Sequence, residues 1–224
     1  MELLTALRTT GAIRSFTDQA VTDELIAEIL DVARFAPSGG NRQPWRVAVV
    51  RDRAIRAELA RLMQPTWDEY IAARASGQAP FNPVDYAAPT EVTAAPNELL
   101  DTLVDAPAVL VIAADLSQVA AMDLELDRLP LVSGASVYPF CWSVLLAAHH
   151  HGLGGVLTTF LARSEPEATA LLDLPADHAI SAMVVLGVPV TRPIRLRRRP
   201  VHEFTTVDRF SGTPLASPTD QHDP

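Results

Sequence analysis

Lysine is absent from this sequence, and all 18 of its basic residues are arginines. Schiff-base chemistry and the phosphate-binding P-loop both require a lysine amine, so the absence excludes them. Any anion that binds must be met by arginine, by backbone N–H groups or by hydroxyls. Cysteine is nearly absent as well, since Cys141 stands alone. One cysteine excludes an internal disulfide and a cysteine-rich metal site.

Long apolar runs are also missing. No stretch reaches the ~18 residues that span a bilayer, and no charged-then-apolar leader is visible. The sequence therefore predicts a cytoplasmic protein without a membrane partner. A formal net charge of −9 argues against a nucleic-acid partner, because bulk electrostatics would repel it. With 224 residues, 48% of them hydrophobic, the chain can bury the core of one large domain.

The hydrophobic pattern mixes helices and strands without a strict alternation. Thr22 followed by two acids is typical of a helix N-cap. A continuous apolar run over 108–114 predicts a central strand covered on both faces. Helices are expected at about 23–35, 53–63, 134–151 (buried all round) and 165–173, and strands at 45–51, 108–114, 154–160 and 180–188. The sequence thus predicts an α+β fold, a mixed central sheet flanked by helices.

Two segments interrupt this pattern. Residues 64–97 hold five prolines and few aliphatic residues, but they include Trp67, Tyr70, Phe81 and Tyr86. We expect an ordered insertion within a single domain over 1–210, whose aromatic residues either line a substrate pocket or form a small core of their own. Residues 189–210 bury little against themselves, so this arm must lie on the domain body or on a second subunit. The tail, 211–224, is expected to be flexible.

The stretch APSGGNRQPW, residues 36–45, joins an expected helix to an expected strand. Gly39 and Gly40 allow backbone geometry that brings N–H groups near a planar ring. Ser38 and Asn41 offer hydroxyl and amide groups for the polar edge of such a ring or its side chain. Taken alone, the stretch fits an ordinary helix-to-strand loop equally well.

Helix, APSGGNRQPW and strand in this order resemble the signature of the FMN-dependent nitroreductase family. Three further segments match the family in the same order, and they are Ala12–Asp18, Gly152–Thr159 and Leu196–Phe210. The resemblance implies a homodimer with FMN between the two subunits. It also implies that the C-terminal arm is exchanged and supplies the last strand of the partner's sheet.

The resemblance also assigns candidate site residues. Arg14 would meet the pyrimidine edge of FMN, and backbone groups of Leu157, Thr158 and Thr159 would approach its redox nitrogen. The remaining cofactor contacts would come from Ser38, Gly39, Gly40, Asn41 and Gln43, with phosphate bound by one or more of Arg197, Arg198 and Arg199. Trp67, Tyr70 and Tyr138 are candidates for the substrate pocket. No side chain is expected to act as a catalytic acid or base, because the flavin carries the chemistry.

One departure from the family concerns the phosphate. Many members carry an arginine-bearing triplet before the Ile13–Arg14 pair, and here those positions are Thr10–Gly11–Ala12. Two expected phosphate ligands are therefore missing, and the 197–199 arginines, or Arg8, would have to compensate. This departure keeps open a flavin-storing protein without turnover.

The implied activity is a ping-pong hydride transfer. NADH or NADPH would reduce the flavin, and a flat acceptor, nitroaromatic or quinone-like, would then take the same place. The alternative within the fold is another reaction, such as dehalogenation, ring dehydrogenation or flavin fragmentation. No metal is expected, because three consecutive helical residues, His149 to His151, point about 100° apart. Cys141, in an apolar helix, is expected to be a buried thiol.

Overall fold

The structure, a computed structural model, describes residues 2–193 and 196–215. The chain divides into two compact units, Met1–Arg192 and Pro193–Pro224, and each is described by itself. The first unit holds all the strands and α-helices found in the described residues. The predicted arm, residues 189–210, begins within the first unit and continues from residue 193 in the second.

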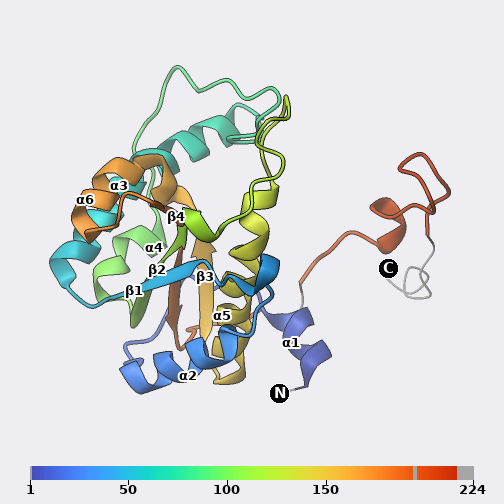
Figure 1. Cartoon of the computed structure of the whole chain (residues 1–224). Coiled ribbons are helices and arrows are strands. Elements are labelled where there is room, and N and C mark those ends of the chain that lie inside the picture. The colour runs from blue at the N-terminus through green and yellow to red at the C-terminus, as the bar shows by residue number, and fades with distance from the viewer. Residues whose placement is uncertain (1, 194–195, 216–224) are drawn as a thin grey trace. The chain divides into compact units, whose positions relative to one another are not determined.

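A four-stranded antiparallel sheet forms the centre of the first unit (Figure 1). Its order is β1 (Trp45–Val50), β2 (Ala108–Asp115), β4 (His178–Gly187) and β3 (Gly154–Thr158). The prediction of a mixed sheet is wrong for these strands, because every neighbouring pair in the described chain runs antiparallel. A parallel pairing occurs there only as an isolated bridge between Ala12 and Gly155.

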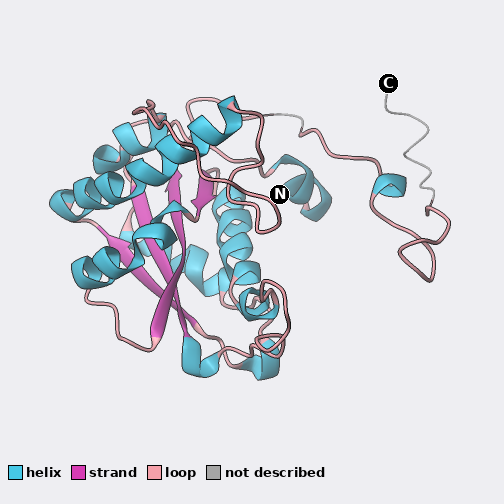
Figure 2. Ribbon diagram, turned by 90° about the horizontal axis from the view of Figure 1, so that it is seen from above, coloured by secondary structure: helices cyan, strands magenta, loops and turns pink. Residues whose placement is uncertain are grey.

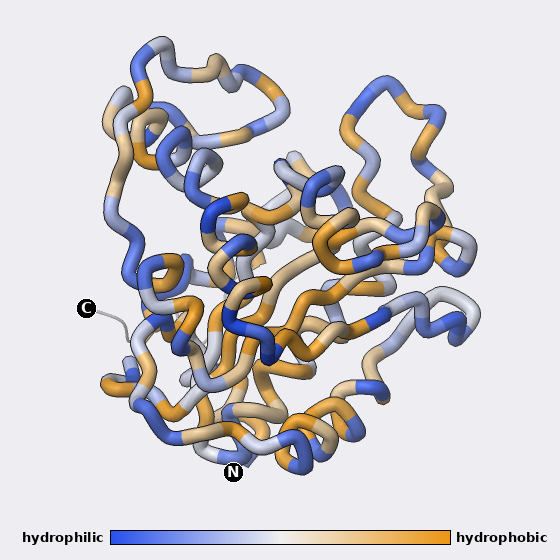
Figure 3. The backbone as a smooth tube through the Cα atoms, turned by 90° about the vertical axis from the view of Figure 1, so that its left-hand side faces the viewer, coloured by the Kyte–Doolittle hydropathy of each residue, from blue (hydrophilic) through white to orange (hydrophobic). Residues whose placement is uncertain are grey.

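Helices cover both faces of this sheet, as Figure 2 shows from above. On one face, α2 (Asp23–Ala33) and α5 (Tyr138–His150) pack against alternate residues of β2, including Leu110 and Ile112. The opposite face packs against α3 (Arg53–Ala75), α4 (Glu98–Asp101) and α6 (Glu165–Leu172), with Val109 and Val111 between. All eight residues of β2 are buried, which confirms the central strand covered on both faces. The tube in Figure 3 is correspondingly hydrophobic through the sheet.

Two of the predicted helices differ from the observed ones. The α3 helix continues through Pro65 to Ala75, so the predicted insertion begins inside a helix. Proline removes one hydrogen bond to the preceding turn. Pro65 is exposed, as is Arg61, whose carbonyl loses that bond and can turn to solvent. The α5 helix starts at Tyr138 and is not buried all round, since Trp142 is 38% exposed.

The remaining elements are short. Thr22 caps α2 as predicted, its hydroxyl accepting from the Leu25 N–H at 3.3 Å. An additional helix, α1 (Leu3–Thr9), lies at the N-terminus, and β3 ends two residues before the predicted boundary. Short 3₁₀ turns are η1 (Gly39–Asn41), η2 (Leu103–Asp105), η3 (Leu116–Gln118), η4 (Val132–Ser136), η5 (Phe160–Ser164) and η6 (Val201–Glu203). Within the described ranges, no helix combines the length and apolarity needed to cross a membrane.

The second unit folds back on itself over a short distance. Thr206 and Pro214 form an antiparallel bridge, and the Val207 N–H donates to the Thr213 carbonyl at 2.9 Å. The arginines at 197–199 precede this turn, and Arg198 donates to the Arg197 carbonyl at 2.7 Å. Residues 216–224 of the predicted tail lie outside the described residues.

Candidate functional site

A pocket of about 220 Å³ lies where the N-terminal segment, α3, α4 and the end of β3 meet. Six of the predicted site residues line it, and they come from segments more than 140 positions apart in sequence. The lining residues are Arg14, Trp67, Tyr70, Asn97, Leu99, Leu100, Val156, Leu157, Thr158, Thr159 and Phe160. The structure therefore brings together Arg14, the Leu157–Thr159 segment and two of the three candidate substrate aromatics.

Two glycines at the start of β3 place Arg14 in this pocket. The Ile13 N–H donates to the Gly155 carbonyl at 2.8 Å, which fixes the N-terminal segment alongside the strand. A Cβ on Gly154 would lie only 2.7 Å from Cγ1 of Ile13, so this close approach requires glycine. The Arg14 side chain is exposed and forms no ion pair with the residues that the structure describes. Its guanidinium is free to meet a bound ligand.

The end of β3 presents backbone donors to the pocket. The strand pairing ends at Thr158, whose partner is Met183, and the chain then turns into η5. The Thr158 hydroxyl accepts from the Phe160 N–H at 3.4 Å. Among the described residues, none accepts a hydrogen bond from the Thr159 N–H, although the Thr159 carbonyl accepts from Ala162. A free N–H at this position suits a hydrogen bond to a ring nitrogen or oxygen.

Aromatic rings form one wall of the pocket. Trp67 and Tyr70 stack on α3 with their centroids 5.6 Å apart and their planes 13° apart. Phe160 is tilted against both, at 6.0 Å from Trp67 and 5.8 Å from Tyr70. Trp67 and Tyr70 line the pocket, while Phe81 packs against Tyr70 and Tyr86 packs against Phe81. A role of this wall in binding a substrate stays a prediction.

Asn97 is a lining residue that the sequence reasoning missed. Its Oδ1 caps α4, accepting from the N–H groups of Leu99 at 3.0 Å and Leu100 at 3.3 Å. The residue is only 8% exposed, and its Nδ2 donates to no other described group. The cap fixes the orientation of the amide, so the N–H pair of Nδ2 remains for whatever occupies the pocket. Asn97 followed by Glu98 is an N-cap pattern that the sequence does carry.

The loop Ser38–Gln43 is held by its own hydrogen bonds. The Ser38 hydroxyl accepts from the Gln43 N–H at 3.0 Å, and the Gln43 amide donates to the Asn41 side chain and carbonyl, each at 3.3 Å. Three of its residues adopt the left-handed conformation, with φ of 60° at Gly40, 55° at Asn41 and 51° at Gln43. Non-glycine residues rarely adopt the left-handed conformation, and this loop contains two of them. The hydrogen bonds within the loop therefore enforce its shape.

This loop does not line the pocket of Arg14. Its Gly39 N–H donates to the Ser136 hydroxyl at 3.0 Å, just before α5. Tyr138, the third candidate substrate residue, lines a different cavity of about 360 Å³ and donates to the Ser181 carbonyl at 3.3 Å. The loop leads into β1, whereas Leu157–Thr159 lie at the end of β3, and β1 and β3 are the opposite edge strands of the sheet. The predicted cofactor residues thus form two separate groups in one chain.

The segment before Arg14 offers no side chain to a phosphate. Thr10 is only 8% exposed, and its hydroxyl donates to the Ala6 carbonyl at 2.7 Å. Ala12 bridges to Gly155. The arginines at 197–199 belong to the second unit, and they form no ion pair with residues in the described ranges.

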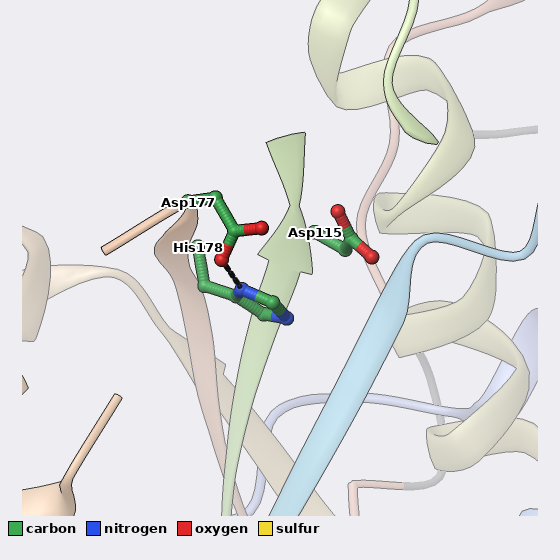
Figure 4. A group of neighbouring side chains, drawn as sticks. All are labelled: Asp115, Asp177 and His178. Carbon is green, nitrogen blue, oxygen red and sulfur yellow. Dashed lines mark hydrogen bonds and ion pairs between the residues drawn. The ribbon is translucent and has the colours of Figure 1, made fainter. Parts of the chain in front are cut away.

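A group of possible metal ligands, Asp115, Asp177 and His178, lies at one end of the sheet (Figure 4). His178 Nδ1 is 2.7 Å from the Asp177 carboxylate. Hydrogen bonds from the Ser117 hydroxyl and N–H lower the pKa of Asp115, whose other oxygen pairs with Arg46 at 3.4 Å. Because the local bonds and a neighbouring guanidinium account for this group, we assign no metal to it.

His149 and Cys141 are both buried within the protein. His149 is buried between the Thr9 hydroxyl, 3.0 Å from Nε2, and the guanidinium of Arg192, which contacts Nδ1. Burial and the Arg192 charge lower the pKa of His149. Cys141 is fully buried in α5, and burial raises its pKa to about 12. The prediction of a buried thiol is confirmed.

The chain belongs to the nitroreductase family, whose model matches residues 7–188. It is 29% identical over 201 residues to an NADH dehydrogenase of Thermus thermophilus, covering 90% of this chain and 93% of that protein. It is 30% identical over 179 residues to a 5,6-dimethylbenzimidazole synthase of Rhodospirillum rubrum, covering 79% and 77%. Its fold matches iodotyrosine deiodinase bound to FMN and 3-iodo-L-tyrosine, with TM-score 0.68, 20% identity and coverage of 93% and 100%. The protein is therefore a nitroreductase-family oxidoreductase.

Proposed function

We propose that the protein uses NADH or NADPH and bound FMN to reduce flat electrophilic acceptors, either nitroaromatic or quinone-like. The pocket of Arg14 carries this proposal, because it joins one free cation, free backbone and amide donors, and an aromatic wall. A flavin requires polar contacts for its pyrimidine edge, and an acceptor stacked on the flavin requires a flat apolar surface on its other side. The NADH-dependent name of one relative and the FMN bound to another support the choice.

Each lining residue has a separate task in this proposal. Arg14 would hold the pyrimidine edge and stabilise negative charge on the reduced ring. The Nδ2 of Asn97, with no other partner in the described chain, would donate to a ring oxygen. The Thr159 N–H would orient the ring at its reactive nitrogen. Bound FMN supplies both the hydride acceptor and the donor, so nicotinamide and acceptor would occupy the same place in turn.

The lining also favours a neutral acceptor. Arg14 is the single charged residue among those that line the pocket, and no carboxylate is present there. An amino-acid substrate such as 3-iodo-L-tyrosine would bring an ammonium group that needs an anionic partner. The nearby Glu69 is already bound, because Tyr86 donates to one of its oxygens and Arg163 to the other. A nitroaromatic or quinone needs no such partner.

The two separate groups of cofactor residues support a homodimer. The loop leads into β1 and Leu157–Thr159 lie at the end of β3, and these are the two edge strands of the sheet, so one chain presents its two groups at different edges. In the proposed dimer, each flavin would contact Arg14 of one subunit and the Ser38–Gln43 loop of the other. The exchanged arm would bring arginines 197–199 to the phosphate, where Thr10 and Ala12 offer none.

A mixed-dimer experiment tests this arrangement. Arg14→Ala and Asn41→Ala chains, each alone, should form dimers in which every flavin site is defective. Co-expression at equal levels makes half of the dimers mixed, and each mixed dimer contains one intact site. Tight flavin binding should return to about a quarter of all sites. If no sites return, both groups belong to one subunit's site or the loop does not bind flavin.

The absorption spectrum of the purified protein tests the function itself. We expect a yellow protein whose visible bands bleach on anaerobic addition of NADH or NADPH and return when nitrobenzene or 1,4-benzoquinone is added. Colourless protein that does not take up added FMN would refute the proposal. A yellow protein that neither NADH nor NADPH bleaches would instead be a flavin-storing protein. The missing phosphate ligands at Thr10–Gly11–Ala12 are the reason for testing this alternative.

The second candidate function is another reaction on the same fold, as the names of two relatives illustrate. Dehalogenation would show as iodide release from 3-iodo-L-tyrosine by the reduced protein. Flavin fragmentation would show as oxygen-dependent loss of the flavin spectrum without an acceptor. If either proceeds faster than reduction of nitrobenzene and 1,4-benzoquinone, the acceptor class proposed above is wrong.

A further inference from the structure

Three segments meet at one carboxylate behind the aromatic wall. Glu69 lies on α3, between the two wall residues Trp67 and Tyr70. Tyr86, on the loop that follows α3, donates its hydroxyl to Glu69 Oε1 at 2.6 Å. Arg163, on the turn that follows Thr159, donates to Glu69 Oε2 at 3.0 Å. The Glu69 side chain is only 17% exposed, so solvent screens these contacts weakly.

The same contacts join the ring stack to the loop. The Arg163 guanidinium lies 5.0 Å from the centre of the Phe81 ring, within the range of a cation–π interaction. Phe81 in turn lies 6.5 Å from Tyr70 and 5.3 Å from Tyr86. Burial raises the pKa of Tyr86 to about 12, so its hydroxyl remains a donor to Glu69 at any physiological pH. Glu69, Phe81, Tyr86 and Arg163 do not line the pocket themselves.

We propose that Glu69 is a positioning residue that fixes the Trp67–Tyr70 wall at a set distance from the Thr158–Thr159 backbone and thereby selects acceptors of single-ring size. The proposal rests on the proposed function, since it assigns an acceptor to the space between wall and flavin. Its physical basis is that one carboxylate on α3 holds the loop that follows α3, through Tyr86, and the turn that follows Thr159, through Arg163. A charge-assisted contact of this kind is among the stronger side-chain interactions in a protein.

Two variants remove one contact each. Tyr86→Phe keeps the ring and loses only the hydroxyl, while Glu69→Gln keeps the shape and loses the charge that Arg163 meets. The matched control is Glu58→Gln, which removes an exposed carboxylate from the same helix, where it pairs with Arg61 at 2.6 Å. Glu58 does not line the pocket.

Hydrogen exchange of the backbone amides in 76–97 measures how firmly Glu69 holds the loop after α3. Steady-state kinetics with two acceptors measure the effect of this contact on acceptor selection. We expect exchange about tenfold faster in Glu69→Gln and Tyr86→Phe than in the control. The KM for 1,4-benzoquinone should rise about tenfold, and that for the two-ring 2-methyl-1,4-naphthoquinone by less than about twofold. The kcat and the Kd for FMN should stay within about twofold of the control.

The outcomes separate this proposal from the proposed function. Unchanged exchange, or KM values that rise in the same ratio for both quinones, would overturn the positioning role. An effect on FMN binding as large as that on KM would also overturn it, because the wall would then be part of the flavin site. If the wild-type protein binds no FMN, the proposed function fails, and exchange alone decides whether Glu69 fastens the wall.

Discussion

Replacing Gly155 with alanine should disturb the strand and the cofactor pocket together. An added Cβ would lie 2.5 Å from Leu186 Cδ2, 2.8 Å from the Val185 carbonyl oxygen and 2.9 Å from Leu145 Cδ2. Ordinary contact begins at 3.4 Å, so the carbonyl oxygen would have to move by 3.4 − 2.8, or about 0.6 Å. This carbonyl belongs to β4, which is hydrogen-bonded on both sides within the sheet. The leucine side chains can turn away, but the backbone cannot.

The cost can be estimated from overpacking in other protein cores. An extra methyl group in a tight site costs about 1–3 kcal/mol, and a backbone clash favours the middle of this range, about 2 kcal/mol. For a chain of this size, about 2 kcal/mol lowers Tm by about 4–8 °C. Gly155 also accepts the Ile13 N–H at 2.8 Å, so displacement of the strand displaces Arg14. The lost charged contact should weaken FMN binding about tenfold or more.

Thermal unfolding and titration of flavin fluorescence measure the two effects on the same sample. Gly39→Ala is the control for stability, because its Cβ would meet Ser136 Oγ at an ordinary 3.5 Å. Its Tm should change by about 1 °C or less. A Gly155→Ala protein with the Tm of the wild type would show that the sheet accommodates the methyl group, and the reasoning about Arg14 placement would fail with it.

Three further predictions concern groups outside the pocket. Because the pKa of His149 is lowered in the folded protein, the unfolded chain binds more protons below about pH 6.5. Stability should therefore fall from pH 7 to pH 5 in a Tm series, and His149→Gln should remove that part of the slope; parallel curves would contradict this. Arg56→Met leaves three backbone carbonyls without their donor and should cost about 3 kcal/mol in urea unfolding. The exposed ion-pair variant Arg53→Met should cost less than about 1 kcal/mol, and equal losses would refute the argument. Cys141, with its pKa raised to about 12, should resist a thiol reagent at pH 8 until guanidinium unfolds the chain.

Part of this fold follows from the sequence alone. The run over 108–114 has apolar residues at every position, so it fits only a strand with helices on both faces, and β2 is that strand. The clustering of Arg14 with Thr158 and Thr159 followed from a family resemblance carried by short motifs. These three residues line one pocket, and their role toward a flavin stays a prediction.

Other features depend on tertiary context that no local pattern contains. Pro65 and Arg61, whose carbonyl loses a hydrogen bond to the proline, are both exposed in α3, and this exposure cannot be read from the residues themselves. The direction of each strand depends on which strands become neighbours, so the antiparallel order was not predictable from the strand residues. Asn97 carried an N-cap pattern, but its free Nδ2 matters only because α4 lies beside the end of β3.

The absence of lysine has a consequence at the pocket itself. The lining contains one charged side chain, and around it are aromatic, aliphatic and amide groups. A lysine amine surrounded in this way gives up its proton readily, whereas a guanidinium keeps its charge and presents several donors in one plane. Arg14 can therefore keep a positive charge beside a ring that becomes anionic on reduction, even after a flat acceptor excludes water. A chain without lysine thus keeps the proposed electrostatic role at this pocket through an arginine.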